Sequence, residues 1–185
     1  KRLPSPAIEK EEGRILIIRQ EKAEDYEAVY HVVKEAFQNA EYTDGNEQNL
    51  VVALRKSKAF IPQLSLVAVE DQRVVGYILF TKAVVNGVQV LALAPLDLQA
   101  SRARNRLAVL PEYQNRGIGL ALIAEGHRAA RSLGYGYSVV LGHPQYYPKA
   151  GYLPASRYGI RAPFPVADEN FMAICLNAEP KPLDG

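Results

Sequence analysis

Residues 107–119, LAVLPEYQNRGIG, decide the fold of this chain. They begin with four apolar residues, continue through a polar turn, and end on two glycines, Gly117 and Gly119. Residues 117–133 predict a helix, and Gly134 is suited to end it, because helices often stop at a glycine in the left-handed conformation. The order is therefore strand, turn and helix, with both glycines at the start of the helix.

A turn of this kind is suited to bind an anion. The free N–H groups of a helix N-terminus point toward one spot, and the helix dipole adds partial positive charge there. Gly117 and Gly119 have no side chains, so a pyrophosphate could approach the backbone closely, with Arg116 adding charge at the rim. No Lys-Ser/Thr pair follows the glycines and the G-x-G-x-x-G spacing is absent, which argues against a Walker site and a dinucleotide fingerprint. Taken alone, the glycines are also compatible with simple tight packing.

The rest of the chain predicts a mixed sheet with helices on both faces, an α/β fold. Asn86-Gly87 favours a type I′ turn in a hairpin, because both residues tolerate positive φ. The helix after residues 107–110 leads to another apolar strand at residues 138–141, so these two strands should be parallel, whereas the hairpins are antiparallel. Helices are also expected at residues 25–39 and 47–58, and strands at residues 14–19, 65–69 and 74–80 and on both sides of the hairpin at 84–90, running on to residue 96.

The composition is that of an ordinary globular protein, with 48% hydrophobic and 23% charged residues in a chain of 185. The formal net charge of +2 is too small to indicate nucleic acid or an anionic membrane as the main partner. No apolar stretch approaches the roughly 18 residues that span a bilayer. We expect residues 1–13 to be a loose leader, residues 14–177 to form one domain, and residues 178–185 to be a tail.

Cys175 is the only cysteine, which excludes an intramolecular disulfide and a zinc site built from several cysteines. Its apolar neighbours Phe171, Ile174 and Leu176 predict a buried position in a strand. Since no apolar signal-peptide core is evident near the N-terminus, the expected compartment is the reducing cytoplasm.

Residues 107–119 resemble, over their whole length, the strand-four-to-helix-three signature of the GNAT superfamily of N-acetyltransferases. Residues 139–152, VVLGHPQYYPKAGY, are similar to its second signature, which ends in Tyr-x-Lys-x-Gly-aromatic. Residues 64–81, LSLVAVEDQRVVGYILFT, look like the family's strand-two–strand-three hairpin, and residues 157–176 are similar to the tail of a bacterial branch of predicted acetyltransferases. The resemblance covers most of residues 14–176.

The resemblance implies a mostly antiparallel sheet in which a parallel pair, the family's fourth and fifth strands, splays apart to admit acetyl-CoA. The backbone of Leu107, Ala108 and Val109 would pair with the pantetheine arm, and an N–H group near Val109 would stabilise the oxyanion that develops on the thioester. The other cofactor-binding residues that it implies are Tyr146 and those whose N–H groups would hold the pyrophosphate: Gln114, Asn115, Arg116, Gly117, Ile118 and Gly119.

Tyr147 stands where many family members carry a tyrosine that protonates the departing thiolate. A phenol has a pKa of about 10 and a thiol of about 8.5, so full proton transfer is slightly uphill. A hydrogen bond that strengthens as the thiolate forms is therefore the expected role. Tyr146 is the neighbouring alternative, and we expect one of the two to face the core and the other the cleft. A role for Tyr147 in packing alone stays open.

The general base is less well marked. His143 follows the strand at residues 138–141 and its pKa range suits a base, but a polar surface histidine is the alternative interpretation. Further candidates without stronger support are Glu35, Glu112 and Asp97, whereas His31 and His127 fall in helices and are expected to be structural or solvated. A water chain, or an acceptor that is already neutral, would need no dedicated base.

Residues 97–106, DLQASRARNR, depart from the family pattern, in which an apolar strand runs straight into the signature. Burying Asp97, Arg102, Arg104 and Arg106 in a covered sheet would cost several kcal/mol each. Looping out costs only about 0.6 kcal/mol per doubling of loop length. We therefore expect a loop here, with the strand resuming at residue 107. The loop is either a solvated bulge or a basic lip that contacts an acidic substrate or a CoA phosphate.

The activity implied by the resemblance is transfer of an acetyl group from acetyl-CoA to a primary amine, by direct attack in a ternary complex. The alternative is a degenerate acyl-CoA-binding or regulatory domain without turnover, since the fold alone does not decide between them. The expected partners are acetyl-CoA and an amine-bearing acceptor, with no metal, nucleic acid or membrane. The expected state is a monomer or homodimer.

Overall fold

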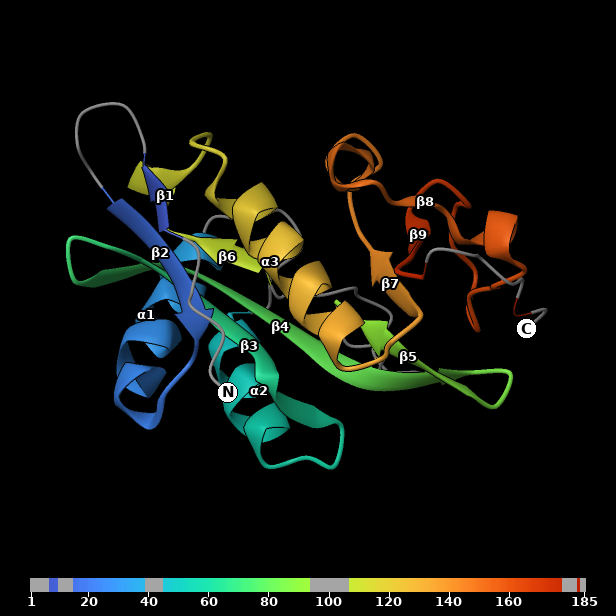
Figure 1. Cartoon of the computed structure of the whole chain (residues 1–185), viewed down its shortest axis with the longest axis horizontal. Helices are drawn as coiled ribbons and strands as arrows, with labels where there is room; N and C mark the ends of the chain where they lie inside the picture. The colour runs from blue at the N-terminus through green and yellow to red at the C-terminus, as the bar shows by residue number, and fades with distance from the viewer. Residues whose placement is uncertain (1–6, 10–14, 39–44, 94–106, 178–182, 184–185) are drawn as a thin grey trace.

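The computed structural model describes residues 7–9, 15–38, 45–93, 107–177 and 183. Within them, a nine-stranded sheet has the order β1-β2-β3-β4-β5-β7-β9-β8, with β6 added to β4 (Figure 1). The strands are β1 Ala7–Glu9, β2 Ile15–Gln20, β3 Phe60–Glu70, β4 Arg73–Val85, β5 Val88–Ala92, β6 Leu107–Val109, β7 Tyr137–Leu141, β8 Leu153–Pro154 and β9 Phe171–Cys175. Every pair is antiparallel except β5 with β7, which confirms the predicted mixed, mostly antiparallel sheet.

Two tight hairpins build the middle of the sheet. β3 passes into β4 through Asp71 and Gln72, and β4 passes into β5 through Asn86 and Gly87. All four turn residues have positive φ, and the values of 48° at Asn86 and 76° at Gly87 agree with the expected type I′ turn. β4 is longer than predicted. Its residues 74–81 are all buried, because helices cover both faces, and such a strand lacks the alternation by which its ends could be recognised.

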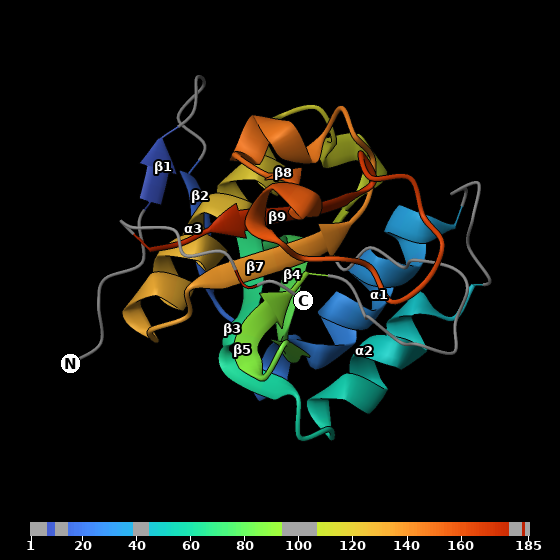
Figure 2. The same cartoon turned by 90° about the vertical axis from the view of Figure 1, so that its right-hand side faces the viewer.

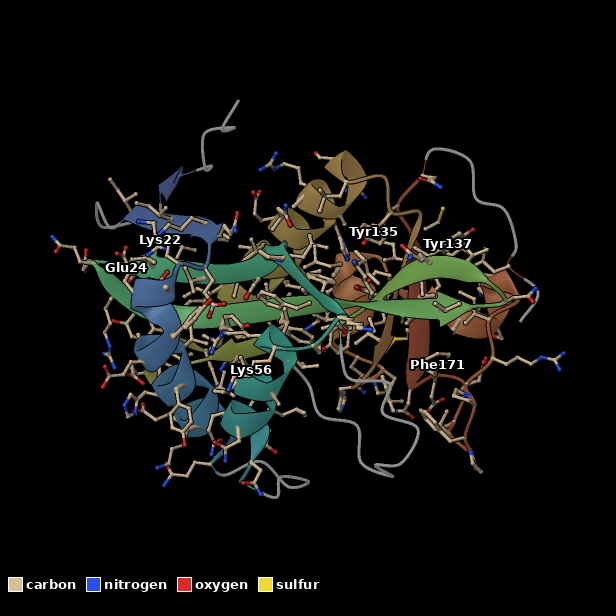
Figure 3. All side chains as sticks on the ribbon, turned by 90° about the horizontal axis from the view of Figure 1, so that it is seen from below. Lys22, Glu24, Lys56, Tyr135, Tyr137 and Phe171 are labelled. Atoms are coloured by element: carbon tan, nitrogen blue, oxygen red, sulfur yellow. The ribbon has the colours of Figure 1, made fainter. Side chains whose placement is uncertain are left out.

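Helices cover both faces of the sheet, as predicted. α1 (Tyr26–Phe37), which follows the short helical turn η1 (Ala23–Asp25), and α2 (Glu47–Arg55) lie on one side of the strands, whereas α3 (Ile118–Ser132) lies on the other (Figure 2). Figure 3, seen from the side of α1 and α2, shows these two helices next to each other on the same side of the sheet. α3 packs closely on β4, so the helix that follows β6 is held directly over the centre of the sheet.

The end of α3 is the one that the sequence predicts. The N–H groups of Gly134 and Tyr135 donate to the carbonyls of Arg131 and Ala130, which is the Schellman arrangement, and Gly134 has a φ of 83°. α2 ends at Arg55, three residues before the predicted end, because the chain turns there toward β3.

β5 and β6 are two parts of one interrupted strand. Both pair antiparallel with β4, on the edge opposite β3. Thr81 and Ile78 lie three positions apart on β4, whereas their partners Ala92 and Leu107 lie fifteen positions apart, so twelve additional residues connect them. Because twelve is even, the alternation of side chains between the two faces continues from β5 into β6. The predicted resumption of the strand is confirmed, while the expected loop at residues 97–106 lies outside the described residues.

The sheet opens between β6 and β7. β7 is parallel to β5, which it pairs through Ser138 and Val139, and it has no pairing with β6 in the part of the chain that is described. The strands at residues 107–110 and 138–141 run in the same direction, as predicted, but the hydrogen-bonded partner of β7 is β5. Figure 1 shows α3 running between β6 and β7. The edge of β6 that faces away from β4 is thus left open among the described strands.

Parts of both predicted end segments belong to the fold. Ala7–Glu9, within the predicted leader, forms β1 and pairs with β2, and an edge strand of three residues is too short to be recognised by periodicity. In the predicted tail, Leu183 accepts a hydrogen bond from the side chain of Asn86 at 3.0 Å and donates one to the Tyr158 carbonyl at 2.9 Å. Cys175 lies in β9, as predicted, but is partly exposed rather than buried, because it is at the strand's end.

Candidate active site

The open edge of β6 carries backbone groups suited to a bound chain. The Leu110 N–H donates to the Val75 carbonyl beside it on β4, at 3.0 Å. Because the N–H groups of an antiparallel strand alternate between its two edges, those of Leu107 and Val109 point away from β4, into the opening. Ala108 has the opposite orientation, and its side chain is 1% exposed. Leu107 and Val109 therefore offer hydrogen bonds for an added strand, whereas Ala108 does not.

The turn from β6 into α3 forms a concave backbone surface. It begins with the helical turn η2 (Pro111–Tyr113). Asn115 and Gly117 then have positive φ values of 59° and 75°, with Arg116 between them, a pattern that turns successive N–H groups toward one side. The Ala121 N–H makes a helical hydrogen bond to Gly117, and the N–H groups before it have no partner within α3. The shape of the turn is the one expected from the sequence, and the binding of an anion there stays a prediction.

Two further contacts shape this surface. The side-chain N–H of Gln114 donates to the Val109 carbonyl at 3.2 Å and so closes the turn after β6. At Gly119, an added Cβ would lie 2.2 Å from the hydroxyl oxygen of Tyr146 and 3.5 Å from its ring carbon Cζ. The missing side chain at Gly119 is therefore what lets the Tyr146 ring lie across the first turn of α3.

A cavity of about 540 Å³ lies between β6, the start of α3 and the helical turn η3 (Tyr147–Ala150), a size typical of small-molecule sites. It brings together most of the residues that the sequence singles out: Leu107, Val109, Gln114, Asn115, Gly117, Ile118, Gly119, His143, Tyr146 and Tyr147. Ala108 and Arg116 are not among its lining residues, since Ala108 is buried in the sheet and Arg116 pairs with Glu70. The cavity adds Tyr113, Leu120 and Lys149, of which the lysine belongs to the Tyr-x-Lys-x-Gly motif and could have been identified there.

Tyr147 and Tyr146 form the wall of the cavity opposite β6. Tyr147 is the inner ring, 1% exposed, and Tyr146 is the outer, half-buried one, in agreement with the expected division between core and cleft. The rings meet edge to face with their centroids 5.2 Å apart. Burial, with smaller effects of Tyr152 and Tyr146, raises the pKa of the Tyr147 phenol far above its usual range, and burial also raises the pKa of Tyr146. Both phenols are thus neutral.

Tyr152 supports Tyr147 from behind, with the two ring centroids 5.7 Å apart. Its hydroxyl is hydrogen-bonded to Nε2 of His127 at 3.0 Å and to the hydroxyl of Ser138 at 2.9 Å, and all three side chains are buried. Burial, with a smaller effect from the charge of Arg131, lowers the pKa of His127 to about 4, so the imidazole is neutral. His127 is structural, as expected, and this buried network fixes the surface on which Tyr147 packs.

The candidates for a general base are less well placed for their proposed role than Tyr147 and Tyr146 are for theirs. His143 lines the cavity, its Nδ1 accepts the backbone N–H of Gln145 at 3.2 Å, and its role as a base stays a prediction. Glu112 is ion-paired with an arginine on the exposed surface. Glu35 lines a separate hollow beside the β3–β4 turn, and Asp97 lies outside the described residues. Among the described residues, no carboxylate lines the cavity.

The described part of the chain contains no group of three or more His, Cys, Asp or Glu residues placed to hold a metal ion. None of its helices has the length and apolar character that crossing a bilayer requires.

Comparison with known proteins places these features in context. A family model for the acetyltransferase (GNAT) domain matches residues 62–154. The uncharacterized N-acetyltransferase YjhQ of Escherichia coli K12 is 37% identical over 143 residues, which are 75% of this chain and 75% of that protein. A GNAT family acetyltransferase from Brucella melitensis, crystallised with acetyl-CoA, is 29% identical with a TM-score of 0.69, over 90% of this chain and 92% of that one. For the fold alone, YhbS of Escherichia coli, crystallised with CoA, gives a TM-score of 0.72 at 24% identity, over 96% and 85% of the two chains.

Proposed function

This chain belongs to the GNAT family of acetyltransferases, and we propose that it transfers an acetyl group from acetyl-CoA to a primary amine by direct attack within a ternary complex. One observation carries the proposal: the open backbone edge of β6 and the concave start of α3 line the same cavity. An extended arm with a pyrophosphate at its end would use both surfaces at once. The Brucella relative, whose structure contains acetyl-CoA, supports the same assignment.

The residues of the chain fit the two ends of acetyl-CoA. The N–H groups of Leu107 and Val109 would bind the pantetheine arm, and one of them would donate to the thioester oxygen, where negative charge develops during transfer. The N–H groups of residues 115–119 would hold the pyrophosphate, whereas that of Gln114 already donates to the Pro111 carbonyl at 3.2 Å. Lys149 lines the same cavity with an exposed side chain, so its ammonium group would add a charged contact without having to be buried.

Acetyl-CoA supplies an activated acetyl group. The amine nitrogen forms a bond to its carbonyl carbon, and the carbon–sulfur bond breaks. The nitrogen loses one proton, and the sulfur gains one. Tyr147 donates a hydrogen bond to the departing sulfur. Because burial raises the pKa of its phenol, loss of the proton would leave a buried phenolate, and the tyrosine therefore stabilises the thiolate without ionising. The proton of the amine passes to water, and the thiolate of CoA takes up its proton from water.

A second candidate function is an acyl-CoA-binding or regulatory domain without turnover. It is favoured by the twelve extra residues between β5 and β6, which interrupt the strand next to the cavity. We further propose a cytoplasmic location, on the basis of the single cysteine, and a monomeric or homodimeric state. Cell fractionation tests the location, and light scattering tests the state.

An assay of free-thiol release from acetyl-CoA tests the proposal, with a panel of amines, polyamines, amino acids and peptides as acceptors. We expect at least one class of amine to stimulate thiol release and to gain one acetyl group by mass spectrometry. Gly119→Trp, whose indole would fill the start of α3, is the matched control without activity. Saturable CoA binding with no acetylation across the panel would support the second candidate instead.

A further inference from the structure

Arg116 and Glu70 form an ion pair beside the proposed pyrophosphate site. The Arg116 guanidinium donates two hydrogen bonds, of 2.8 and 3.0 Å, to the two carboxylate oxygens of Glu70. Glu70 is the last residue of β3, and its side chain is 1% exposed. A buried carboxylate is stable only with a partner of this kind, so the positive charge of Arg116 is already matched by a buried negative one.

The same hairpin holds the loop at two more points. Arg73, at the start of β4, pairs with Glu112 at 3.1 Å. The Cζ atoms of Arg73 and Arg116 lie over the ring of Tyr113, 5.7 and 5.0 Å from its centroid. The loop at residues 111–116 is therefore fastened to the tight β3–β4 turn by side chains as well as by the chain itself.

We infer that Glu70 and Arg116 are positioning residues, which together hold the loop in the conformation that binds pyrophosphate, and that the guanidinium of Arg116 is not itself a phosphate ligand. The inference rests on the proposed binding of acetyl-CoA. The loop keeps Asn115 and Gly117 at positive φ, a conformation that a free loop would populate only in part. A loop held in advance loses less conformational entropy when the ligand binds, and affinity rises accordingly. The position of Arg116 outside the cavity lining agrees with this role.

Glu70→Gln tests the inference, because a ligand role and a positioning role for Arg116 predict opposite changes. If the pair positions the loop, the variant should bind CoA about tenfold more weakly by titration calorimetry. Acetyl-pantetheine, which lacks the pyrophosphate, should bind the variant and the unchanged protein equally well by ligand-observed NMR. Glu24→Gln, which breaks an exposed pair with Lys22 away from the loop, is the matched control and should change CoA affinity less than about twofold.

Unchanged or tighter CoA binding by Glu70→Gln would overturn the inference, since removal of Glu70 would then have released Arg116 to a phosphate. A parallel loss of affinity for acetyl-pantetheine would also overturn it, because the damage would not be confined to the loop. Should Glu70→Gln fail to fold, Arg116→Lys gives the same decision. It keeps the charge but loses the planar guanidinium, which donates both hydrogen bonds to Glu70 from Nη2 and lies over the Tyr113 ring, so positioning predicts the tenfold loss and a purely electrostatic role predicts none. If the unchanged protein does not bind CoA, the proposed function fails rather than this inference.

Discussion

The buried His127 makes the stability of this protein depend on pH in a calculable way. Its pKa is lowered to about 4 in the folded protein, against about 6.5 for an ordinary histidine. Between these values the unfolded chain binds a proton that the folded protein does not, so the free energy of unfolding falls as the pH is lowered. One pKa unit corresponds to about 1.4 kcal/mol. The free energy of unfolding therefore falls by about 2 kcal/mol between pH 7 and pH 5, and by about 3 kcal/mol once the pH is below both pKa values.

Urea unfolding at a series of pH values, followed by circular dichroism, measures this loss. His127→Gln is the matched control, because glutamine can keep a hydrogen bond to Tyr152 but has no proton to gain. We expect the unchanged protein to lose about 2 kcal/mol more than the variant between pH 7 and pH 5. Equal losses would show that His127 is not held neutral, and the buried network behind Tyr147 would then need another explanation.

Three further changes test the site. Tyr147→Phe should lower kcat by about 10²–10⁴-fold while leaving CoA affinity nearly unchanged, and an equal loss in Tyr146→Phe, or none in either, would remove Tyr147 from the mechanism. Gly119→Ala should weaken CoA binding, by about fivefold in calorimetry, because its Cβ would meet the Tyr146 hydroxyl. Adding Tyr146→Phe should restore the affinity, and a double variant as weak as the single one would contradict this contact. Deletion of residues 95–106 should leave a folded protein with CoA affinity within about threefold, since the twelve missing residues match the shift in register between β5 and β6. An unfolded deletion variant would show that these residues belong to the core.

The elements that can be predicted from the sequence are those with local signals. Asn86-Gly87 specifies its turn through backbone conformation, and Gly134 specifies the end of α3 in the same way. The opening of the sheet has no such signal, because it depends on β7 pairing with β5 rather than with β6. Both β5 and β6 are far from β7 in the sequence and lie along the same edge of β4, so no local pattern decides between them. The strand at Ala7–Glu9 depends on β2 for its pairing and carries no pattern of its own.

In the site, too, features with a local signal can be predicted from the sequence, and features that depend on the fold cannot. Gly117 and Gly119 can be singled out from the sequence because a backbone without side chains is suited to a ligand at a helix start, and their contact with pyrophosphate stays a prediction. The partner of Arg116 cannot, since Glu70 lies 46 residues earlier and meets it only through the fold. Ala108 looks like its neighbours in sequence, and only the register of β6 on β4 shows that its backbone faces the sheet.

Titration of CoA into the protein by calorimetry tests the central claim most directly, because that claim is a binding site formed by β6 and the start of α3. We predict a single saturable site in the unchanged protein and no heat of binding in Gly119→Trp, whose circular dichroism spectrum should match. Ligand at 100 times its dissociation constant should also add about 2.7 kcal/mol of stability and raise Tm by about 5–10 °C. No heat and no thermal shift with saturating CoA in the unchanged protein, or equal binding by Gly119→Trp, would contradict the account.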